Sequence, residues 1–192
     1  MSTKPQKKKQ VTSWHVSVAA EAIAASMFAR CGLDVSIQYG ANQPEYDLLI
    51  ARGDDVLKVS VKGSQDGSWG LTQKYLPKRD AVEKKKGKEP DYHAAIDAWL
   101  KAHGRKTIFC LVQFRGIELN QLPRIYLASP AEIAKRLHET ANGRGDTILY
   151  EKKTWTSRAW AAGATDEVPM AWGFSEKRVM QFIRAKNPVN MS

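Results

Sequence analysis

The sequence predicts an α/β protein in which helices flank a central mixed sheet of about five strands. Some segments place apolar residues three and four positions apart, as one face of a helix does, whereas others alternate or run apolar residues together, as strands do. These segments follow one another in the order helix, three strands, helix, two strands and helix. The 192 residues, 43% hydrophobic and 26% charged, suffice for one domain with its own core.

The N-terminal half predicts a helix followed by a three-strand meander. The helix covers 14–31, with Thr12 or Ser13 as its N-cap and Gly32 as its stop signal. Three segments rich in apolar and β-branched residues then predict strands at 35–39, 46–52 and 56–64. The short link at 53–55 makes the last two of these strands a hairpin.

The C-terminal half predicts the elements that complete the layers. The polar, lysine-rich segment 65–92 predicts a mobile loop with a short strand near 69–71. Ser129 followed by Pro130 is a strong signal for a helix start. The remaining predicted strands lie at 107–114, 124–128 and 147–150, and the helices at 91–103, 130–140 and 175–186.

We expect one structural domain with two appendages. Residues 1–11 predict a flexible basic tail, and residues 12–150 the α/β core, with a basic insert at 65–106. Residues 151–192 predict an extension rich in aromatic residues, in which the tryptophans at 155, 160 and 172 pack onto the sheet.

The positive charge predicts a polyanionic partner. The chain has 30 Lys and Arg against 20 Asp and Glu, a formal net charge of +10. The first ten residues hold four lysines and no acid, and residues 74–106 hold ten basic against five acidic residues. Because clusters of this kind release counterions from a nucleic acid, we expect a nucleic-acid partner, with DNA as the first choice.

The other compositional features predict a cytoplasmic protein without a membrane partner. No apolar run is long enough to span a bilayer, and none follows the N-terminal lysines as in a secretory signal. Cys31 and Cys110 form neither a disulfide framework nor a CxxC motif, so we expect unreactive thiols.

Asp47, Lys62 and Glu21 form the candidate catalytic site. Asp47 begins one strand of the predicted hairpin and Lys62 lies near the end of the other, so the hairpin brings them to the same end of the sheet. Glu21, at the edge of the apolar stripe of the first helix, can supply a second carboxylate. Carboxylates bind Mg²⁺, and a lysine stabilises negative charge on phosphorus, so this set predicts phosphodiester hydrolysis.

The helix with Glu21, the string PEYDLLIA with Asp47 and the string VSVKGS with Lys62 together resemble the PD-(D/E)xK nuclease superfamily. The resemblance implies a restriction-endonuclease-like core, which consists of a helix, a three-strand meander carrying the site, a second helix and a further strand. It also implies that Mg²⁺, or Mn²⁺, binds to Asp47, Glu21 and the backbone carbonyl of Val61, with Lys62 as the catalytic lysine.

Ser60 departs from this family pattern, which has an acidic residue or a glutamine two positions before the lysine. A hydroxyl is a weaker Mg²⁺ ligand than a carboxylate. Three readings follow: Glu21 and Asp47 suffice for one metal, a carboxylate from Glu45 or Asp66 replaces the missing one, or the site is inactive and the fold only binds.

Residues after the lysine predict contacts to nucleic acid. The polar side chains Ser64, Gln65 and Gln73 lie close to the expected phosphate position. Trp69 predicts either a ring that stacks on a base or an anchor that packs its loop onto the core. The expected backbone contacts are Lys74, Lys84, Lys85, Lys86 and Lys88.

The first functional hypothesis is a Mg²⁺-dependent endonuclease that cleaves DNA, acting alone or as a homodimer. The alternative is a catalytically inactive nucleic-acid-binding module on the same fold, which the serine at position 60 motivates. A third hypothesis is an interaction factor whose basic face meets an acidic protein partner.

Overall fold

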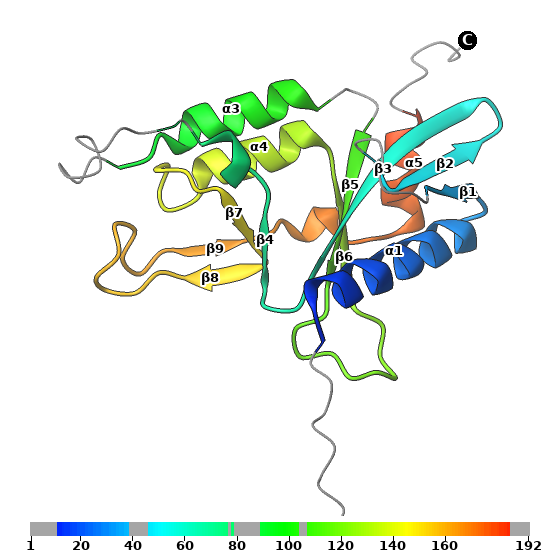
Figure 1. Ribbon diagram of the computed structural model, residues 1–192, viewed down its shortest axis with the longest axis horizontal. Coiled ribbons are helices and arrows are strands. Elements are labelled where there is room, and N and C mark those ends of the chain that lie inside the picture. Colours follow the sequence, from blue (N-terminus) through cyan, green and yellow to red (C-terminus); the bar gives the residue numbers. More distant parts are fainter. Residues whose placement is uncertain (1–10, 39–45, 77, 79–88, 104–106, 185–192) are drawn as a thin grey trace, which may run out of the picture.

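The computed structural model describes residues 11–38, 46–76, 78, 89–103 and 107–184, and it confirms the α/β class (Figure 1). A mixed sheet of five strands has the order β1-β2-β3-β5-β6 and is flanked by helices. All neighbouring strands are antiparallel except β3 and β5, which are parallel. The strands are β1 (Asp34–Ile37), β2 (Leu48–Arg52), β3 (Asp55–Ser64), β5 (Thr107–Gln113) and β6 (Arg124–Ala128).

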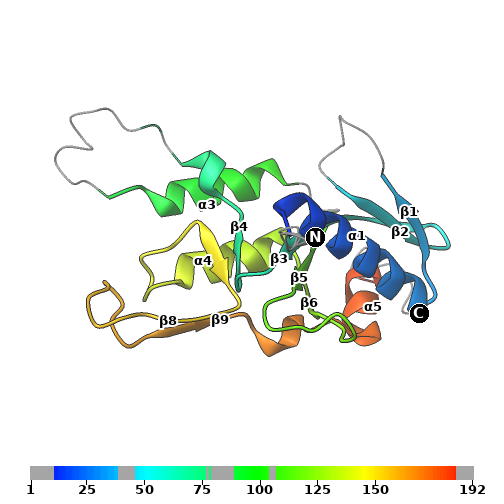
Figure 2. The same cartoon turned by 60° about the horizontal axis from the view of Figure 1, so that its bottom comes forward.

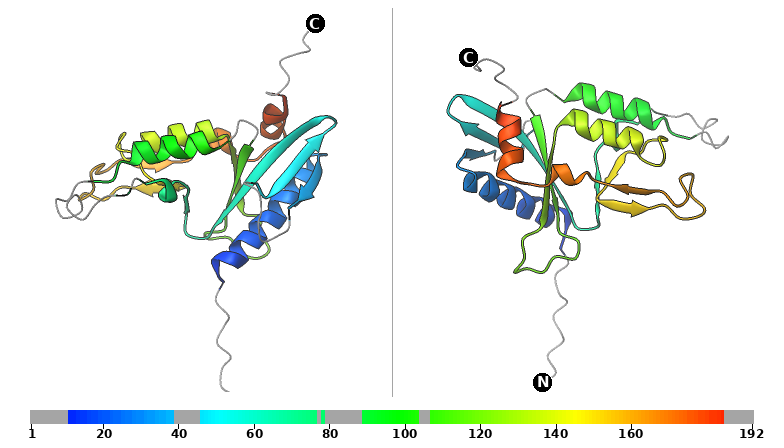
Figure 3. Two further views of the ribbon diagram at one scale, coloured as in Figure 1. Left: turned by 45° about the horizontal axis from the view of Figure 1, so that its top comes forward. Right: turned by 180° about the vertical axis from the view of Figure 1, so that it is seen from behind.

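Helices α1 (Ser13–Arg30) and α5 (Glu176–Arg184) cover one face of the sheet (Figure 3). Ala20, Ala24 and Phe28 place a buried stripe of α1 against the sheet, as the spacing of these residues predicts. Val59 and Val61 of β3 face this layer and are buried with them. Burial of this stripe is the main driving force for docking α1, because the hydrophobic effect scales with the apolar area removed from water.

Helices α3 (Tyr92–Ala102) and α4 (Pro130–Glu139) cover the other face of the sheet at β5 and β6. Their core includes Trp99 of α3, Leu137 of α4 and Phe109 of β5. On the neighbouring strand β3, Lys58 and Lys62 are exposed. The left view of Figure 3 shows α3 and α4 on one side and the β2–β3 hairpin on the other. The second layer therefore covers the sheet unevenly, and a cleft opens beside β3.

Shorter elements extend this second layer. The segment after β3 forms β4 (Ser68–Gly70) and a single 3-10 turn, η1 (Gln73–Tyr75), and β4 pairs with β7 (Ile148–Tyr150). The short strand predicted near 69–71 is thus confirmed.

The C-terminal extension contributes to both cores and also projects from the molecule. Strands β8 (Lys152–Thr154) and β9 (Thr165–Glu167) form a hairpin that extends away from the sheet (Figure 2). A 3-10 turn, η2 (Met170–Trp172), then leads to α5. Trp172 is buried as predicted, but Trp160 is 74% exposed, so the prediction that it packs on the sheet is wrong. The loop between β8 and β9 carries Trp160 beyond the reach of the core.

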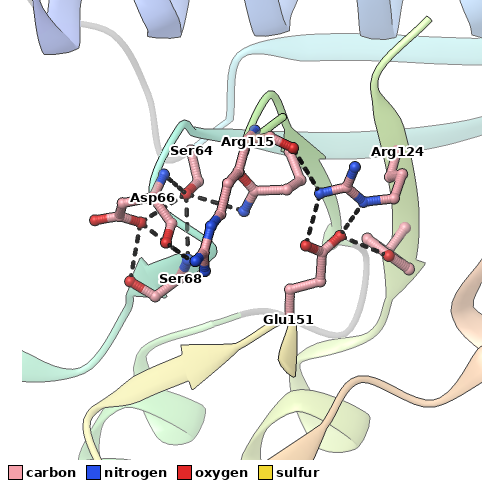
Figure 4. Close-up of polar contacts among 8 residues, drawn as sticks. Ser64, Asp66, Ser68, Arg115, Arg124 and Glu151 are labelled. Carbon is pink, nitrogen blue, oxygen red and sulfur yellow. Dashed lines mark hydrogen bonds and ion pairs between the residues drawn. The ribbon is translucent and has the colours of Figure 1, made fainter. Parts of the chain in front are cut away.

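A polar network holds the ends of β3, β5 and β6 together (Figure 4). The carboxylate of Glu151 accepts hydrogen bonds from Arg124 at 2.6 and 2.8 Å and from the Tyr126 hydroxyl at 2.8 Å. Arg115 donates to the carbonyl of Asp66 at 3.3 Å. Burial raises the pKa of Glu151, but the bonds from Arg124 and Tyr126 outweigh it and lower the pKa below its usual value.

No helix among the described residues is long and apolar enough to cross a membrane.

Gly63 allows α1 to approach β3 closely. A Cβ atom at this position would lie 2.8 Å from the carbonyl oxygen of Val16 and 2.9 Å from the Cβ of Ala20. Backbone cannot move away as a flexible side chain can, so any larger residue here forces α1 away from the sheet.

We therefore expect Gly63→Ala to lower the free energy of unfolding by about 1 to 3 kcal/mol, as overpacking does in other cores. Urea denaturation monitored by circular dichroism measures the change. The control is Ser17→Ala on the exposed side of the same helix, with an expected change below about 0.5 kcal/mol. Equal stability of the Gly63→Ala variant and the parent protein would show that α1 packs less tightly than described.

Candidate active site

Asp47 lies immediately before the first residue of β2. From this point the longer strand β3 continues without β2 as its partner. Its backbone N–H donates to the carbonyl of Val59 at 2.8 Å, which continues the β2–β3 ladder by one residue. Its carboxylate Oδ2 accepts the backbone N–H of Val61 at 2.6 Å. The side chain is only 14% exposed. The carboxylate therefore accepts the backbone hydrogen bond that a carbonyl of β2 would accept if the pairing with β3 continued.

Ser60 and Lys62 present their side chains to this carboxylate. The Ser60 hydroxyl lies 3.5 Å from Asp47 Oδ2, and the Lys62 ammonium lies 3.9 Å from the same oxygen. Residues two apart on a strand point to the same face, which brings both side chains of β3 to one place. Lys62 is 45% exposed, so its pairing with Asp47 contributes little to stability. The ammonium therefore remains accessible to a ligand.

Glu21 of α1 belongs to the same electrostatic environment. Burial raises the pKa of its carboxyl, the negative charge of Asp47 raises this pKa further, and Lys62 lowers it in part. The charges of Asp47 and Lys62 thus act on Glu21, although Glu21 is not among the residues that line the cleft described below.

The backbone of Val61 faces the side of β3 on which β2 lies. The carbonyl of Val59 accepts from Asp47, and the N–H of Val61 donates to the Asp47 carboxylate. In a strand the N–H and the C=O of one residue point to the same side, so we expect the Val61 carbonyl on the side of β2.

The oxygen donors that the sequence predicts as Mg²⁺ ligands come from Asp47, Glu21 and Val61. They comprise the carboxylates of Asp47 and Glu21 and the carbonyl of Val61, a set to which Mg²⁺ would add waters. Among the described residues, no group of three or more His, Cys, Asp and Glu side chains could hold a metal ion.

Of the two carboxylates considered as replacements for the one absent at Ser60, Asp66 has other partners. Asp66 accepts hydrogen bonds from Ser64 at 3.0 Å and from the backbone and hydroxyl of Ser68 at 2.9 and 3.0 Å (Figure 4). Its carboxylate is thus used within the turn after β3. Glu45 lies outside the described residues.

The candidate site opens into a cleft of about 460 Å³. Asp47, Ser60 and Lys62 form the wall contributed by the hairpin. The opposite wall comes from the β4–η1 segment, α3 and β5, and its lining residues are Gly70, Leu71, Lys74, Tyr75, Trp99, His103 and Phe109. Two lysines and one aspartate line this space, and such a surface suits an anionic ligand.

Among the described residues predicted to contact nucleic acid, Lys74 lines this cleft. Its ammonium lies 5.0 Å from the centre of the Tyr75 ring. Gln73 is exposed on the same turn, whereas Gln65 is exposed beyond β3, in a separate hollow. Lys84, Lys85, Lys86 and Lys88 lie outside the described residues.

Trp69 and Ser64 have structural contacts instead. Trp69 is 3% exposed and its indole N–H donates to the carbonyl of Lys62 at 3.0 Å. The prediction that this ring stacks on a base is therefore wrong, and the alternative of a loop anchor is correct. Ser64 is buried, and its hydroxyl accepts from Gln113 at 3.1 Å. This bond ties the end of β3 to β5.

Two cleft residues, Tyr75 and His103, were not among the predicted site residues. Tyr75 lies on η1 and His103 follows α3, and neither belongs to a motif. Their position depends on how η1 and α3 pack against the sheet, for which the sequence carries no local signal.

A scan against protein-family models, a search of curated proteins and a search of solved structures found no match to this chain.

The raised pKa of Glu21 predicts a pH-dependent effect of Glu21→Gln. If the pKa of a carboxyl is higher in the folded than in the unfolded protein, the protein loses stability as the pH rises through the folded-state pKa, because the charged form is disfavoured in the fold. Removing the charge should therefore raise the melting temperature at pH 7 to 8, with the gain vanishing below about pH 4.

Calorimetry across this range measures the difference between variant and parent. Glu118, an exposed loop residue, provides the control, and Glu118→Gln should leave the melting temperature nearly unchanged at every pH. A lower melting temperature for Glu21→Gln at pH 8 would mean that Lys62, rather than burial and Asp47, dominates the environment of Glu21.

Proposed function

We propose that this protein is a metal-dependent nuclease with a restriction-endonuclease-like core that hydrolyses DNA phosphodiester bonds at Asp47 and Lys62. The observation that carries the proposal is the position of these two side chains. The Asp47 carboxylate, which accepts the backbone N–H of Val61, lies 3.9 Å from the accessible ammonium of Lys62. Both side chains line a cleft that Lys74 also lines.

The element order supports the core assigned by this proposal. A helix, a three-strand antiparallel meander, a helix and a further strand follow one another as the resemblance to the PD-(D/E)xK superfamily implies. Of the three family positions, Asp47 and Lys62 lie 3.9 Å apart, and both charges act on Glu21 of α1, which supports the proposal.

Each residue has a distinct part in the proposed chemistry. Asp47, Glu21 and the Val61 carbonyl are the groups that would hold Mg²⁺ or Mn²⁺, and a bound cation would polarise the phosphate and activate water. Lys62 stabilises the negative charge that grows on the phosphoryl oxygens in the transition state. Lys74 attracts the phosphate backbone into the cleft.

Cleavage of supercoiled plasmid and of single-stranded DNA tests the assignment, with Mg²⁺, Mn²⁺ and EDTA compared. We expect Lys62→Ala to slow metal-dependent cleavage by about 100-fold or more, as the loss of a transition-state charge partner does. Asp47→Asn should be at least as slow, since it removes the charge of a metal ligand.

Lys58→Ala is the matched control, because Lys58 lies on the same strand and the same face as Lys62 and is also exposed. Its ammonium lies 4.9 Å from the Tyr46 ring centre, and its loss removes the same charge. Cleavage by this variant should fall by no more than a few-fold. Equal losses in the two lysine variants, or retained metal-dependent cleavage by both Lys62→Ala and Asp47→Asn, would reject the site.

A second candidate function, binding of nucleic acid without cleavage, is favoured by one observation. Ser60 occupies the cleft position next to Asp47, where a further carboxylate would complete a metal site, and it is 4% exposed. Such a module would bind DNA with an affinity that falls steeply as salt rises and does not depend on metal.

Ser60→Glu separates the two candidates. If the protein is a nuclease, the added ligand should lower the Mg²⁺ concentration needed for half-maximal cleavage by about tenfold, since carboxylates are stronger ligands than hydroxyls. Ser60→Gln controls for side-chain size, and thermal unfolding confirms that both variants fold. A salt-sensitive gel shift with no cleavage by the parent protein or by Ser60→Glu would favour the binding module.

A further inference from the structure

His103 is a titratable group of the cleft that the proposed chemistry leaves without a task. It follows the last turn of α3, and its Nδ1 lies 2.7 Å from the backbone carbonyl oxygen of Trp99. A carbonyl oxygen can only accept a hydrogen bond, so Nδ1 carries the proton of this bond. Nε2 is then the ring nitrogen that can gain or lose a proton.

The imidazole ring is held in position by two aromatic side chains. Its centre lies 4.5 Å from that of Trp99 and 5.3 Å from that of Phe109. Trp99 of α3 and Phe109 of β5 belong to the same hydrophobic core, and each is at most 2% exposed. With Nδ1 bonded to backbone and the ring packed on both aromatics, the orientation of Nε2 is set before a ligand arrives.

His103 lines the same cleft as the candidate catalytic residues. Phe109 of β5 is the partner of Ser60 of β3 in the parallel ladder. His103 packs on Phe109, which lies one strand spacing from Ser60 along the cleft. Asp47, Ser60 and Lys62 line the same cleft from the hairpin side.

We propose that His103 is the general acid of the reaction and donates a proton from Nε2 to the oxygen that leaves phosphorus. This role rests on the proposed nuclease function. In an in-line displacement the attacking water and the leaving oxygen lie on opposite sides of phosphorus. Asp47 and Lys62 line the cleft from the hairpin and His103 lines it from the end of α3, so water that attacks from the side of Asp47 leaves the departing oxygen on the side of His103.

The step is balanced as follows. The water oxygen forms a bond to phosphorus and releases one proton to solvent, and the phosphorus–oxygen bond to the leaving sugar breaks. That oxygen keeps the bonding electron pair and takes the Nε2 proton, so the products are a phosphate monoester and a free hydroxyl. The neutral imidazole then regains a proton from solvent, and positioned acids of this kind contribute about 10² to 10⁴-fold.

A comparison of two substrates tests the role of His103. A DNA oligonucleotide has a sugar alkoxide as its leaving group and needs the proton. The p-nitrophenyl ester of thymidine 5′-monophosphate releases p-nitrophenolate, which leaves without one. We expect His103→Asn to cleave DNA about 100-fold more slowly than the parent protein, and to hydrolyse the nitrophenyl ester within about threefold of it.

Asparagine suits this test because its side-chain N–H can still donate to the Trp99 carbonyl. His93→Asn on the same helix is the control, since His93 is exposed and is not among the cleft-lining residues. Equal losses on both substrates would overturn the proposal and indicate a positioning role. A parent protein that cleaves neither substrate would instead overturn the nuclease function, and the acid role with it.

A binding measurement adds a readout that does not depend on turnover. In EDTA, we expect a DNA oligonucleotide to shift the ¹⁵N resonance of His103 Nε2 in the parent protein, because the phosphodiester accepts a hydrogen bond there. The resonances of His93 should stay in place. Binding of the oligonucleotide without a change at His103 would contradict contact between this ring and the phosphate.

Discussion

The hydrogen bond from the Val61 backbone to the Asp47 carboxylate is the interaction on which the candidate site depends. Strand β3 has ten residues and its neighbour β2 has five, so part of β3 continues past the end of its partner. A buried N–H without a partner would cost about 1 to 3 kcal/mol, and the carboxylate at 2.6 Å removes that cost. The same bond fixes a negative charge beside Ser60 and Lys62. The end of the β2–β3 pairing and the candidate site therefore depend on the same atom, because Asp47 Oδ2 accepts the Val61 N–H and also lies 3.9 Å from the Lys62 ammonium.

The unequal covering of the sheet turns this site into a cleft. On one face α1 packs closely over β3, which Gly63 permits, and the charges of Asp47 and Lys62 act on Glu21 of this helix. On the other face α3 and α4 cover β5 and β6, while the lysines of β3 are exposed. In the cleft between the sheet and α3, the charged side chains of Asp47 and Lys62 are only partly exposed to water. Electrostatic interactions are stronger in such a setting than on an open surface.

The acidic and basic groups of the cleft are arranged asymmetrically, and this arrangement suits a phosphodiester. The hairpin wall carries the Asp47 carboxylate and the Lys62 ammonium, whereas the other lining residues include Lys74 and His103. An anion that enters between the walls meets positive charge on both sides and hydrogen-bond donors with fixed orientation. Ser60 has a neutral hydroxyl where the family pattern has a carboxylate, so it offers a cation less negative charge. The balance between one-cation catalysis and simple binding therefore depends on Asp47, Glu21 and Ser60.

Periodicity and turn length in the sequence determined the class of the fold, the main helices and strands, and the pairing of Asp47 with Lys62. These properties are local: a three-residue link between two apolar strands makes a hairpin, whose register then places residues 47 and 62 at the same end. Tertiary packing alone decided that Trp69 is an anchor instead of a stacking platform, that Trp160 projects on the β8–β9 hairpin, and that His103 enters the cleft. A tryptophan or histidine has the same local pattern whether it is covered or exposed. Its surroundings come from segments distant in the chain, and here the packing of α3 against β5 placed the imidazole in the same cleft as the residues that the hairpin brought together.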